Sequence, residues 1–205
     1  MIYLECKKKG QKMKKNIVFI FLIFFLGLSG AVFAGTITGT VSTKKLKVPK
    51  DVLVYVEKVE GREFPPSAQP AKMDQVNLVY VPRVLPIVRG SEVIFHNSDE
   101  VKHNVFGVGD YDFDLGTWTK GGTKNRLFDK LGEADILCNV HPEMEAYIIV
   151  LQNPYFGLTN EQGVYEIKNV PAGSYKLKTW NDKLKAQLKD AVVPADGPVT
   201  VDFGF

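Results

Sequence analysis

From Gly35 onward the chain alternates short apolar stretches with turn-forming residues. Most stretches alternate apolar with polar positions or are rich in β-branched residues: TITGTV, VLVYVE, VNLVYV, EVIF, YIIVL, VYEI, YKLKTW and VTVDF. Turn signals such as VRGSE, VGDYD, EQG and PAGS separate them. A period of two between turn signals predicts β-strands. The clearest candidate for a helix, NDKLKAQLKDA, also alternates with period two, so the sequence predicts an all-β protein.

A different pattern fills residues 1–34. Met13 begins MKKN, which precedes twelve apolar residues from Ile17 to Leu28 and then the small residues of SGAVFA. This order predicts a secretory signal peptide that is cleaved after Ala34, with Met13 as the true start. The alternative is a retained membrane anchor, because the apolar stretch reaches about 18 residues if it is extended to Ala34. We therefore expect a periplasmic or secreted protein, membrane-anchored if the signal is retained.

Removal of this segment changes the charge and the cysteine count. Residues 1–34 contain six of the 26 basic and one of the 23 acidic residues, so the remainder has 20 basic and 22 acidic residues and a net charge of −2. This balance gives no reason to expect a nucleic-acid partner. Cys6 lies in the removed segment, so Cys138 has no partner for an internal disulfide. A single thiol in an exported protein needs another explanation.

The stretch CNVHPEM, Cys138 to Met144, places three candidate ligands of a soft metal within seven residues. A thiolate, two imidazoles and a weak thioether describe a blue-copper electron-transfer site, whereas zinc sites do not use methionine. A catalytic cysteine is the alternative. It would need a base held by a third group, and the histidine of such a dyad is rarely this close in the chain.

The second imidazole must come from His96 or His103, the other two histidines of the chain. His96 lies in the strand pattern of EVIFHN. If Val93 and Phe95 face the core, strand alternation turns His96 outward. His103 follows this strand in VKHNVF, where the fold could carry it to one end of a sandwich.

The stretches GSEVIFHNSDEVKHNVF and CNVHPEM, with Cys138 placed 35 residues after His103, resemble the cupredoxins of the plastocyanin–amicyanin group. The ligand loop is most similar to that of amicyanin, and the resemblance covers roughly residues 72–152. It implies a Greek-key β-sandwich with one type 1 copper ion. The implied ligands are His103, Cys138 and His141, with Met144 as the axial ligand. Asn104 would tie the two ligand loops together and hydrogen-bond near the thiolate.

The segments on either side resemble a carboxypeptidase regulatory-like, transthyretin-type domain. Its hallmarks are Gly-x-Val, Thr-x-x-x-Gly-x-Tyr and Pro-x-Gly-x-Tyr, which match GTV, TNEQGVY and PAGSY. The resemblance implies a seven-stranded antiparallel sandwich into which the cupredoxin sandwich is inserted. The expected boundaries are 35–60 and 153–205 for this discontinuous domain, 61–71 for a linker and 72–152 for the cupredoxin domain. The alternative is one elaborated cupredoxin with extra edge strands.

The cupredoxin resemblance implies an electron carrier and not an enzyme. It would be a monomer that passes single electrons between redox proteins such as a cytochrome, a dehydrogenase or an oxidase, in the periplasm or at a membrane surface. Three histidines are too few for the second copper centre of a nitrite reductase or multicopper oxidase. The alternatives are copper storage or delivery, and a cell-surface binding module with a structural copper site. Lys183, Lys185 and Lys189 are expected to form a solvated face.

Overall fold

The computed structural model describes residues 34–205, and the predicted signal peptide lies almost entirely outside this part. Every regular element in the described part is a β-strand, which confirms the all-β prediction. The described residues all belong to one compact unit. No helix of the described residues is long and apolar enough to cross a membrane.

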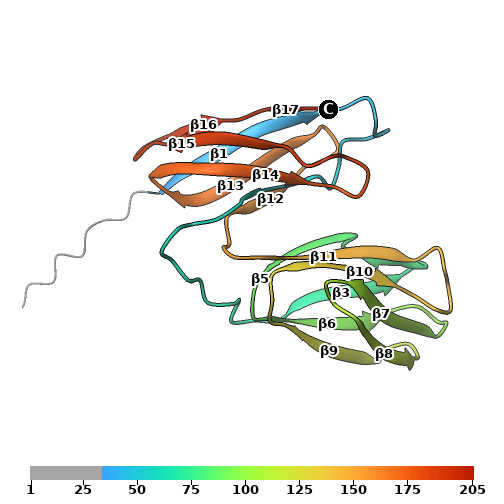
Figure 1. Ribbon diagram of the computed structural model, residues 1–205. Coiled ribbons are helices and arrows are strands. Elements are labelled where there is room, and N and C mark those ends of the chain that lie inside the picture. The colour runs from blue at the N-terminus through green and yellow to red at the C-terminus, as the bar shows by residue number, and fades with distance from the viewer. Residues whose placement is uncertain (1–33) are drawn as a thin grey trace, which may run out of the picture. The chain divides into compact units, whose positions relative to one another are not determined.

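Residues 71–151 form one sandwich of two sheets (Figure 1). The first sheet has the order β4 (Val79–Val81), β3 (Ala71–Val76), β6 (Ser91–Asn97), β9 (Thr123–Phe128). The second has the order β5 (Val84–Val88), β11 (Glu145–Leu151), β10 (Gly132–Leu137), β7 (His103–Gly109), β8 (Phe113–Trp118). Strands β3 and β6, and β5 and β11, pair in parallel, while the other neighbours are antiparallel. This is the strand order of the cupredoxin fold, as the sequence predicts; we call it the cupredoxin sandwich.

Strand alternation builds the core of the cupredoxin sandwich. Along β6, Val93 and Phe95 face the core and are fully buried. His96, the next residue, lies on the opposite face, and its side chain is 26% exposed. The same core contains Cys138 and Met144, which are 3% and 0% exposed. Two of the predicted ligands are therefore embedded in the core of this sandwich, where neighbouring side chains restrict their positions.

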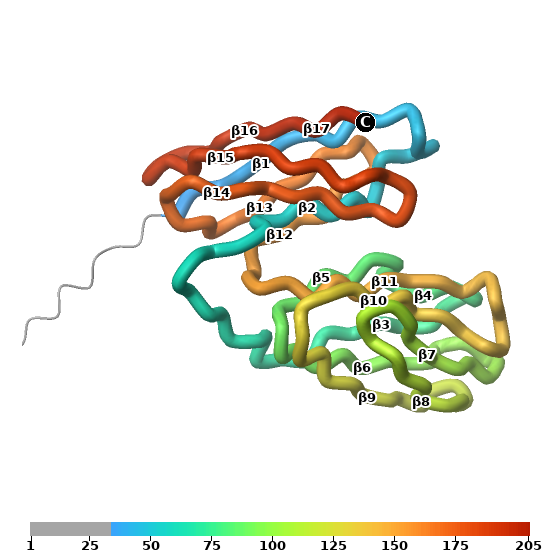
Figure 2. Tube along the Cα trace, in the orientation of Figure 1, coloured from blue at the N-terminus to red at the C-terminus, as the bar shows by residue number. Residues whose placement is uncertain are grey.

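The remaining strands form a second sandwich, the flanking sandwich (Figure 2). One sheet has the order β13 (Val164–Pro171), β1 (Ala34–Ser42), β16 (Pro198–Thr200), and β17 (Phe203–Gly204) also pairs with β1. The other has the order β12 (Phe156–Leu158), β2 (Leu53–Val56), β14 (Gly173–Trp180), β15 (Leu188–Val193). Every sheet takes its strands either from 71–151 or from the flanks. The domain boundaries and the transthyretin-type likeness remain predictions.

The flanking sandwich differs from the expected seven antiparallel strands. Among residues 34–205 it has eight, because the stretch expected as the last strand is broken into β16 and β17, and both pair with β1 in parallel. At the break, the Asp202 carboxylate accepts hydrogen bonds from the N–H and hydroxyl of Thr40, at 2.7 and 2.9 Å. A side chain thus replaces a backbone carbonyl in the ladder.

The turn of TNEQGVY shows why its glycine is required. Gly163 has φ +78° and its carbonyl accepts the N–H of Val41 at 2.8 Å. A Cβ at this position would lie 2.4 Å from the Val41 oxygen. Only glycine combines a positive φ with so close an approach of another backbone.

Candidate metal centre

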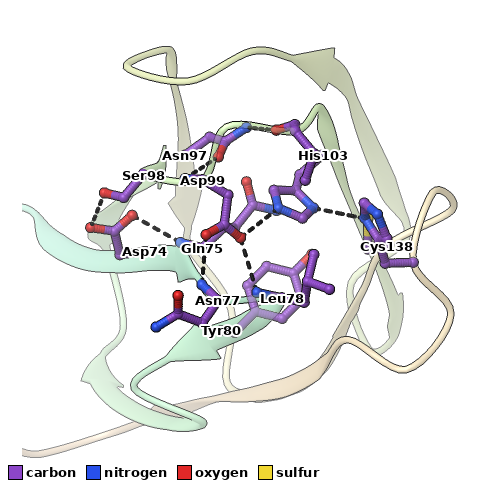
Figure 3. Close-up of polar contacts among 12 residues, drawn as sticks. Asp74, Gln75, Asn77, Leu78, Tyr80, Asn97, Ser98, Asp99, His103 and Cys138 are labelled. Atoms are coloured by element: carbon purple, nitrogen blue, oxygen red, sulfur yellow. Dashed lines mark hydrogen bonds and ion pairs between the residues drawn. The ribbon is translucent and has the colours of Figure 1, made fainter.

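His103 begins β7 and is completely buried. Its Nε2 lies 2.8 Å from Oδ2 of Asp99 (Figure 3). Burial acts to raise the pKa of Asp99, but hydrogen bonds from the Leu78 N–H, from His103 and from the Asn77 N–H outweigh it and lower the pKa. A carboxylate can only accept, so His103 carries a proton on Nε2, and in the neutral ring the Nδ1 lone pair is free to bind a metal.

Asp99 owes its position to a turn that sequence reasoning did not single out. Asn77 and Leu78 connect β3 to β4 with φ values of 54° and 61°. Two successive positive φ angles are typical of the tight hairpin turn that matches strand twist. In this conformation both N–H groups donate to the Asp99 carboxylate, at 2.6 and 3.0 Å. The turn therefore fixes the group that orients His103.

Cys138 follows β10, which runs antiparallel to β7, so the strand pairing brings the thiol beside the start of β7. Its sulfur accepts the backbone N–H of Asn104 at 3.4 Å and lies 4.0 Å from Nδ1 of His103. This N–H holds the sulfur in place beside His103, as contacts around metal ligands commonly do.

His141 lies on the loop between β10 and β11 and is partly exposed. Its Nδ1 is 3.0 Å from Nδ1 of His103, and the two ring centroids are 4.7 Å apart. Since His103 directs its Nε2 proton to Asp99, two imidazole nitrogens face one another across a short gap. One cation between them would satisfy both.

The group fits one metal ion of the copper type. The ligand atoms of His103, Cys138 and His141 lie within 4.8 Å of one another. An ion about 2.1 Å from nitrogen and about 2.3 Å from sulfur allows N–N separations up to about 4.2 Å and N–S separations up to about 4.4 Å. His103 Nδ1 lies 3.0 Å from His141 Nδ1 and 4.0 Å from Cys138 Sγ, both within these limits. The third pair, His141 and Cys138, lies within 4.8 Å. A thiolate with two imidazoles is the donor set of blue-copper sites.

Met144, the predicted axial ligand, is fully buried in the same core as Cys138. Its N–H donates to the carbonyl of His141 at 3.0 Å, which closes a turn in the ligand loop. It also lines a cavity of about 330 Å³ together with Tyr80 and Arg83. The structure therefore holds Met144 against the cupredoxin core, and axial ligation remains a prediction.

Asn104 and Tyr80 connect the two ligand-bearing segments. The Asn104 side chain accepts the N–H of Asn139 at 3.2 Å and donates to Asp114 at 2.7 Å. The Tyr80 hydroxyl lies 2.9 Å from the Leu137 carbonyl and 3.1 Å from that of Asn104. The pKa of Tyr80 is raised, mainly by burial and further by the nearby Cys138. The hydroxyl therefore stays protonated and can donate to these carbonyls.

Sequence reasoning missed Tyr80. The available signal was weak. Tyr80 lies between the exposed Val79 and Val81 in a short strand, so its side chain points inward. A buried tyrosine needs a hydrogen-bond partner for its hydroxyl. His96 lies outside the metal-ligand group and bonds Asp74 and Ser98 through Nδ1, each at 3.0 Å.

No protein-family model and no curated protein matches the chain. Among solved structures, a Cu-containing nitrite reductase (NirK) from Thermus scotoductus SA-01 is 24% identical, with a TM-score of 0.40 over 48% of this chain and 25% of that chain. The present chain thus spans only a quarter of the nitrite reductase. A purple cupredoxin from Nitrosopumilus maritimus is 22% identical, with a TM-score of 0.37 over 39% of this chain and 98% of that chain.

A mutant of amicyanin in its reduced Cu(I) form at pH 4 is also 22% identical, with a TM-score of 0.38 over 42% of this chain and 91% of that chain. All three likenesses are below 25% identity. The cupredoxin fold is assigned here from the order and direction of the strands.

Proposed function

We propose that the chain is an exported type 1 copper protein that carries single electrons between redox proteins. The observation that carries the proposal is the convergence of two imidazole Nδ1 atoms and one thiol sulfur, within 4.8 Å, at one end of a cupredoxin sandwich. When bound there, copper supplies a centre that accepts and releases one electron. The set of one thiolate and two imidazoles suits both Cu(I) and Cu(II).

The residues of the chain provide a rigid site with one accessible edge. His103 is fully buried and held by Asp99, and Cys138 is held by the N–H of Asn104. His141 is partly exposed, and Val140 beside it is 45% exposed. Electrons would therefore enter and leave through the ring of His141, which lies on the surface beside the exposed Val140 and Glu143.

The partner classes we propose are a cytochrome, a dehydrogenase or an oxidase. The place of action is the periplasm or the cell exterior, and the protein acts as a monomer. These proposals are supported by the predicted signal segment and by the single accessible ligand edge of His141.

Visible and EPR spectra of residues 34–205 with one equivalent of Cu(II) test the proposal. These residues contain every described strand and both sandwich cores. We expect an intense thiolate-to-copper band and a narrow copper hyperfine splitting, both lost in Cys138→Ser. His96→Gln is the matched control, because His96 lies outside the ligand group, and it should keep both signals. A pale spectrum in the unaltered protein would exclude the type 1 assignment.

A further inference from the structure

Six exposed lysines gather at one end of the flanking sandwich. The loop between β1 and β2 carries Lys44, Lys45, Lys47 and Lys50, and the loop between β14 and β15 carries Lys183 and Lys185. Leu53 at the start of β2 pairs with Trp180 at the end of β14, so both loops leave the sandwich at the same end (Figure 1). We call this group of six residues the lysine end.

The charges of the lysine end are not neutralised by ion pairs in the described part of the chain. Elsewhere in the flanking sandwich, Lys58, Lys168 and Lys176 each pair with a carboxylate at 2.9 to 3.1 Å. None of the six lysines forms such a pair among residues 34–205.

The carboxylates near the lysine end do not balance it. Asp182 is paired with Arg83. Asp202 is bound to the uncharged Thr40 and keeps its negative charge, and Asp51 and Glu161 also lie at this end. Three carboxylates against six lysines still leave an excess of positive charge. A local excess of one sign attracts a surface of the opposite sign over about a Debye length, roughly 10 Å at 0.1 M salt.

Contacts join the lysine end to the ligand loop. Asp182, in the same loop as Lys183 and Lys185, accepts two hydrogen bonds from Arg83, at 3.2 and 2.7 Å. Arg83 is also 3.4 Å from the carboxylate of Glu145, the residue that follows Met144. The loop with two of the lysines is therefore attached to the strand that leaves the ligand loop.

The surface around His141 carries charges of both signs and no comparable excess of one sign. Lys102 and Glu143 are exposed beside the ligands. Glu145 shares Arg83 with Asp182, and Glu100 pairs with Lys120. The exposed apolar residues Val101 and Val140 lie on the two loops that precede and contain the ligands, each 45% exposed. The accessible edge of His141 thus lies among exposed apolar residues and charges of both signs, whereas the lysine end carries an excess of positive charge.

We propose that the lysine end docks the acidic face of a redox protein partner, so that the flanking sandwich orients the partner over His141. This inference rests on the proposed electron-transfer function and adds the charge class of the partner. Opposite charges steer diffusional encounter and can raise association rates about tenfold or more. The lysines that attract the partner then lie on the flanking sandwich, and His141, which passes the electron, lies on the cupredoxin sandwich.

An acidic protein fits the lysine end better than a membrane does. A loop that inserts into a lipid surface presents several apolar side chains among its basic residues. Here Leu46 packs against the core of the flanking sandwich, and Val48 is the one exposed large apolar residue between Lys44 and Lys50. The loop therefore offers positive charge with little apolar surface.

Reduced cytochrome b5, an acidic haem protein, is a suitable probe. In the assay its Fe(II) is oxidised to Fe(III) while Cu(II) in residues 34–205 is reduced to Cu(I). We expect the second-order rate constant at low salt to fall about tenfold in the triple variant Lys44→Gln, Lys45→Gln, Lys47→Gln. The matched control replaces Lys58, Lys168 and Lys176 by Gln, removes the same charge, and should stay within about twofold. Equal rates in the two variants would overturn the proposal.

A copper-independent readout separates this proposal from the proposed function. Oxidised cytochrome b5 is titrated into metal-free residues 34–205, and we expect its affinity to fall in the Lys44/Lys45/Lys47 variant only. If the copper spectrum is pale but this difference is present, docking stands and electron transfer fails. If the spectrum is blue but the variants bind alike, docking fails alone. Binding to phosphatidylglycerol vesicles that is lost in the variant, with cytochrome b5 binding unchanged, would overturn the proposal in favour of a membrane.

Discussion

The two sandwiches bury polar side chains in similar numbers but use them differently. In the flanking sandwich the buried polar residues bind backbone groups: Thr159 bonds Val52 and Pro49, Thr179 bonds Gln187, and Asn181 bonds Lys183. In the cupredoxin sandwich, Gln75 and Asn97 also bind backbone carbonyls. His103 and Asn104 differ, because they connect to the thiol and to the other ligand loop. The first arrangement holds the chain, whereas the second holds side-chain atoms with lone pairs still available.

Incomplete hydrogen bonding shows the same difference. In residues 34–205, the buried side-chain polar atoms without a partner are Gln75 Oε1, Ser91 Oγ, Trp118 Nε1 and Arg126 Nε. All four belong to the cupredoxin sandwich. Buried polar atoms without partners cost about 1–3 kcal/mol each. None of the four atoms belongs to the ligand group, so they make the cupredoxin sandwich the less completely hydrogen-bonded of the two, apart from any metal.

Copper loading gives the largest test of this comparison. A ligand that binds only the folded state stabilises it by about 4 kcal/mol at a thousand times its dissociation constant. We expect that gain in the cupredoxin sandwich and little of it in the flanking sandwich. Trp118, in β8, reports on the cupredoxin sandwich in the variant Trp180→Phe. Trp180 does not report on the flanking sandwich alone, because its Nε1–H donates to Glu133 and its ring lies 5.1 Å from that of Tyr147. Thermal unfolding of the flanking sandwich is therefore followed by the NMR amide signals of its core residues Ile37, Ile167 and Leu177.

The matched control for copper loading is Cys138→Ser, in which copper should shift neither transition. An equal rise in both transitions of the unaltered protein would contradict the comparison. It would show that the two sandwiches unfold as one cooperative unit.

Two tyrosines offer a smaller and more selective test. The Tyr80 hydroxyl bonds the carbonyl of Leu137 at 2.9 Å beside the ligand loop, and that of Tyr165 bonds the carbonyl of Val201 at 2.5 Å in the flanking sandwich. Replacing either by Phe leaves a buried carbonyl short of a donor and should cost about 1–2 kcal/mol, measured by urea unfolding. Only Tyr80→Phe should also shift the thiolate-to-copper band. A shifted band in Tyr165→Phe would remove the distinction.

The ligand loop could be predicted from sequence because its ligands are close in the chain and carry a specific spacing. The group that orients His103 could not, since the hairpin turn at Asn77 and Leu78 gains its role only when the fold brings it to Asp99. The bond between Arg83 and Asp182 spans 99 positions and has no local signature. The last predicted strand was broken for a similar reason, because strand alternation cannot reveal that a carboxylate will take over a ladder bond.

Acid stability gives the smallest test, on metal-free protein. Burial acts to raise the pKa of Asp74 in the cupredoxin sandwich, but hydrogen bonds from His96, Lys72 and Ser98 lower it to about 2. A folded-state pKa below the ordinary value of 3.8 stabilises the protein above that value, and this stabilisation is lost as the pH falls toward 2. Its size should be at most about 1 kcal/mol, because the partner Lys72 is largely exposed.

The flanking sandwich again supplies the control for this acid test. Hydrogen bonds from Thr40 lower the pKa of Asp202, but Asp202 is fully exposed, so water replaces those bonds readily. The unfolding free energy is measured between pH 5 and pH 2, an interval around the ordinary carboxyl pKa of about 3.9. Its dependence on pH should become weaker in Asp74→Asn. In Asp202→Asn the dependence on pH should be nearly unchanged. If Asp202→Asn weakens the pH dependence as much as Asp74→Asn does, the part-buried network around His96 adds no more acid stability than a surface carboxylate. The difference between the two sandwiches is then confined to the ligand residues.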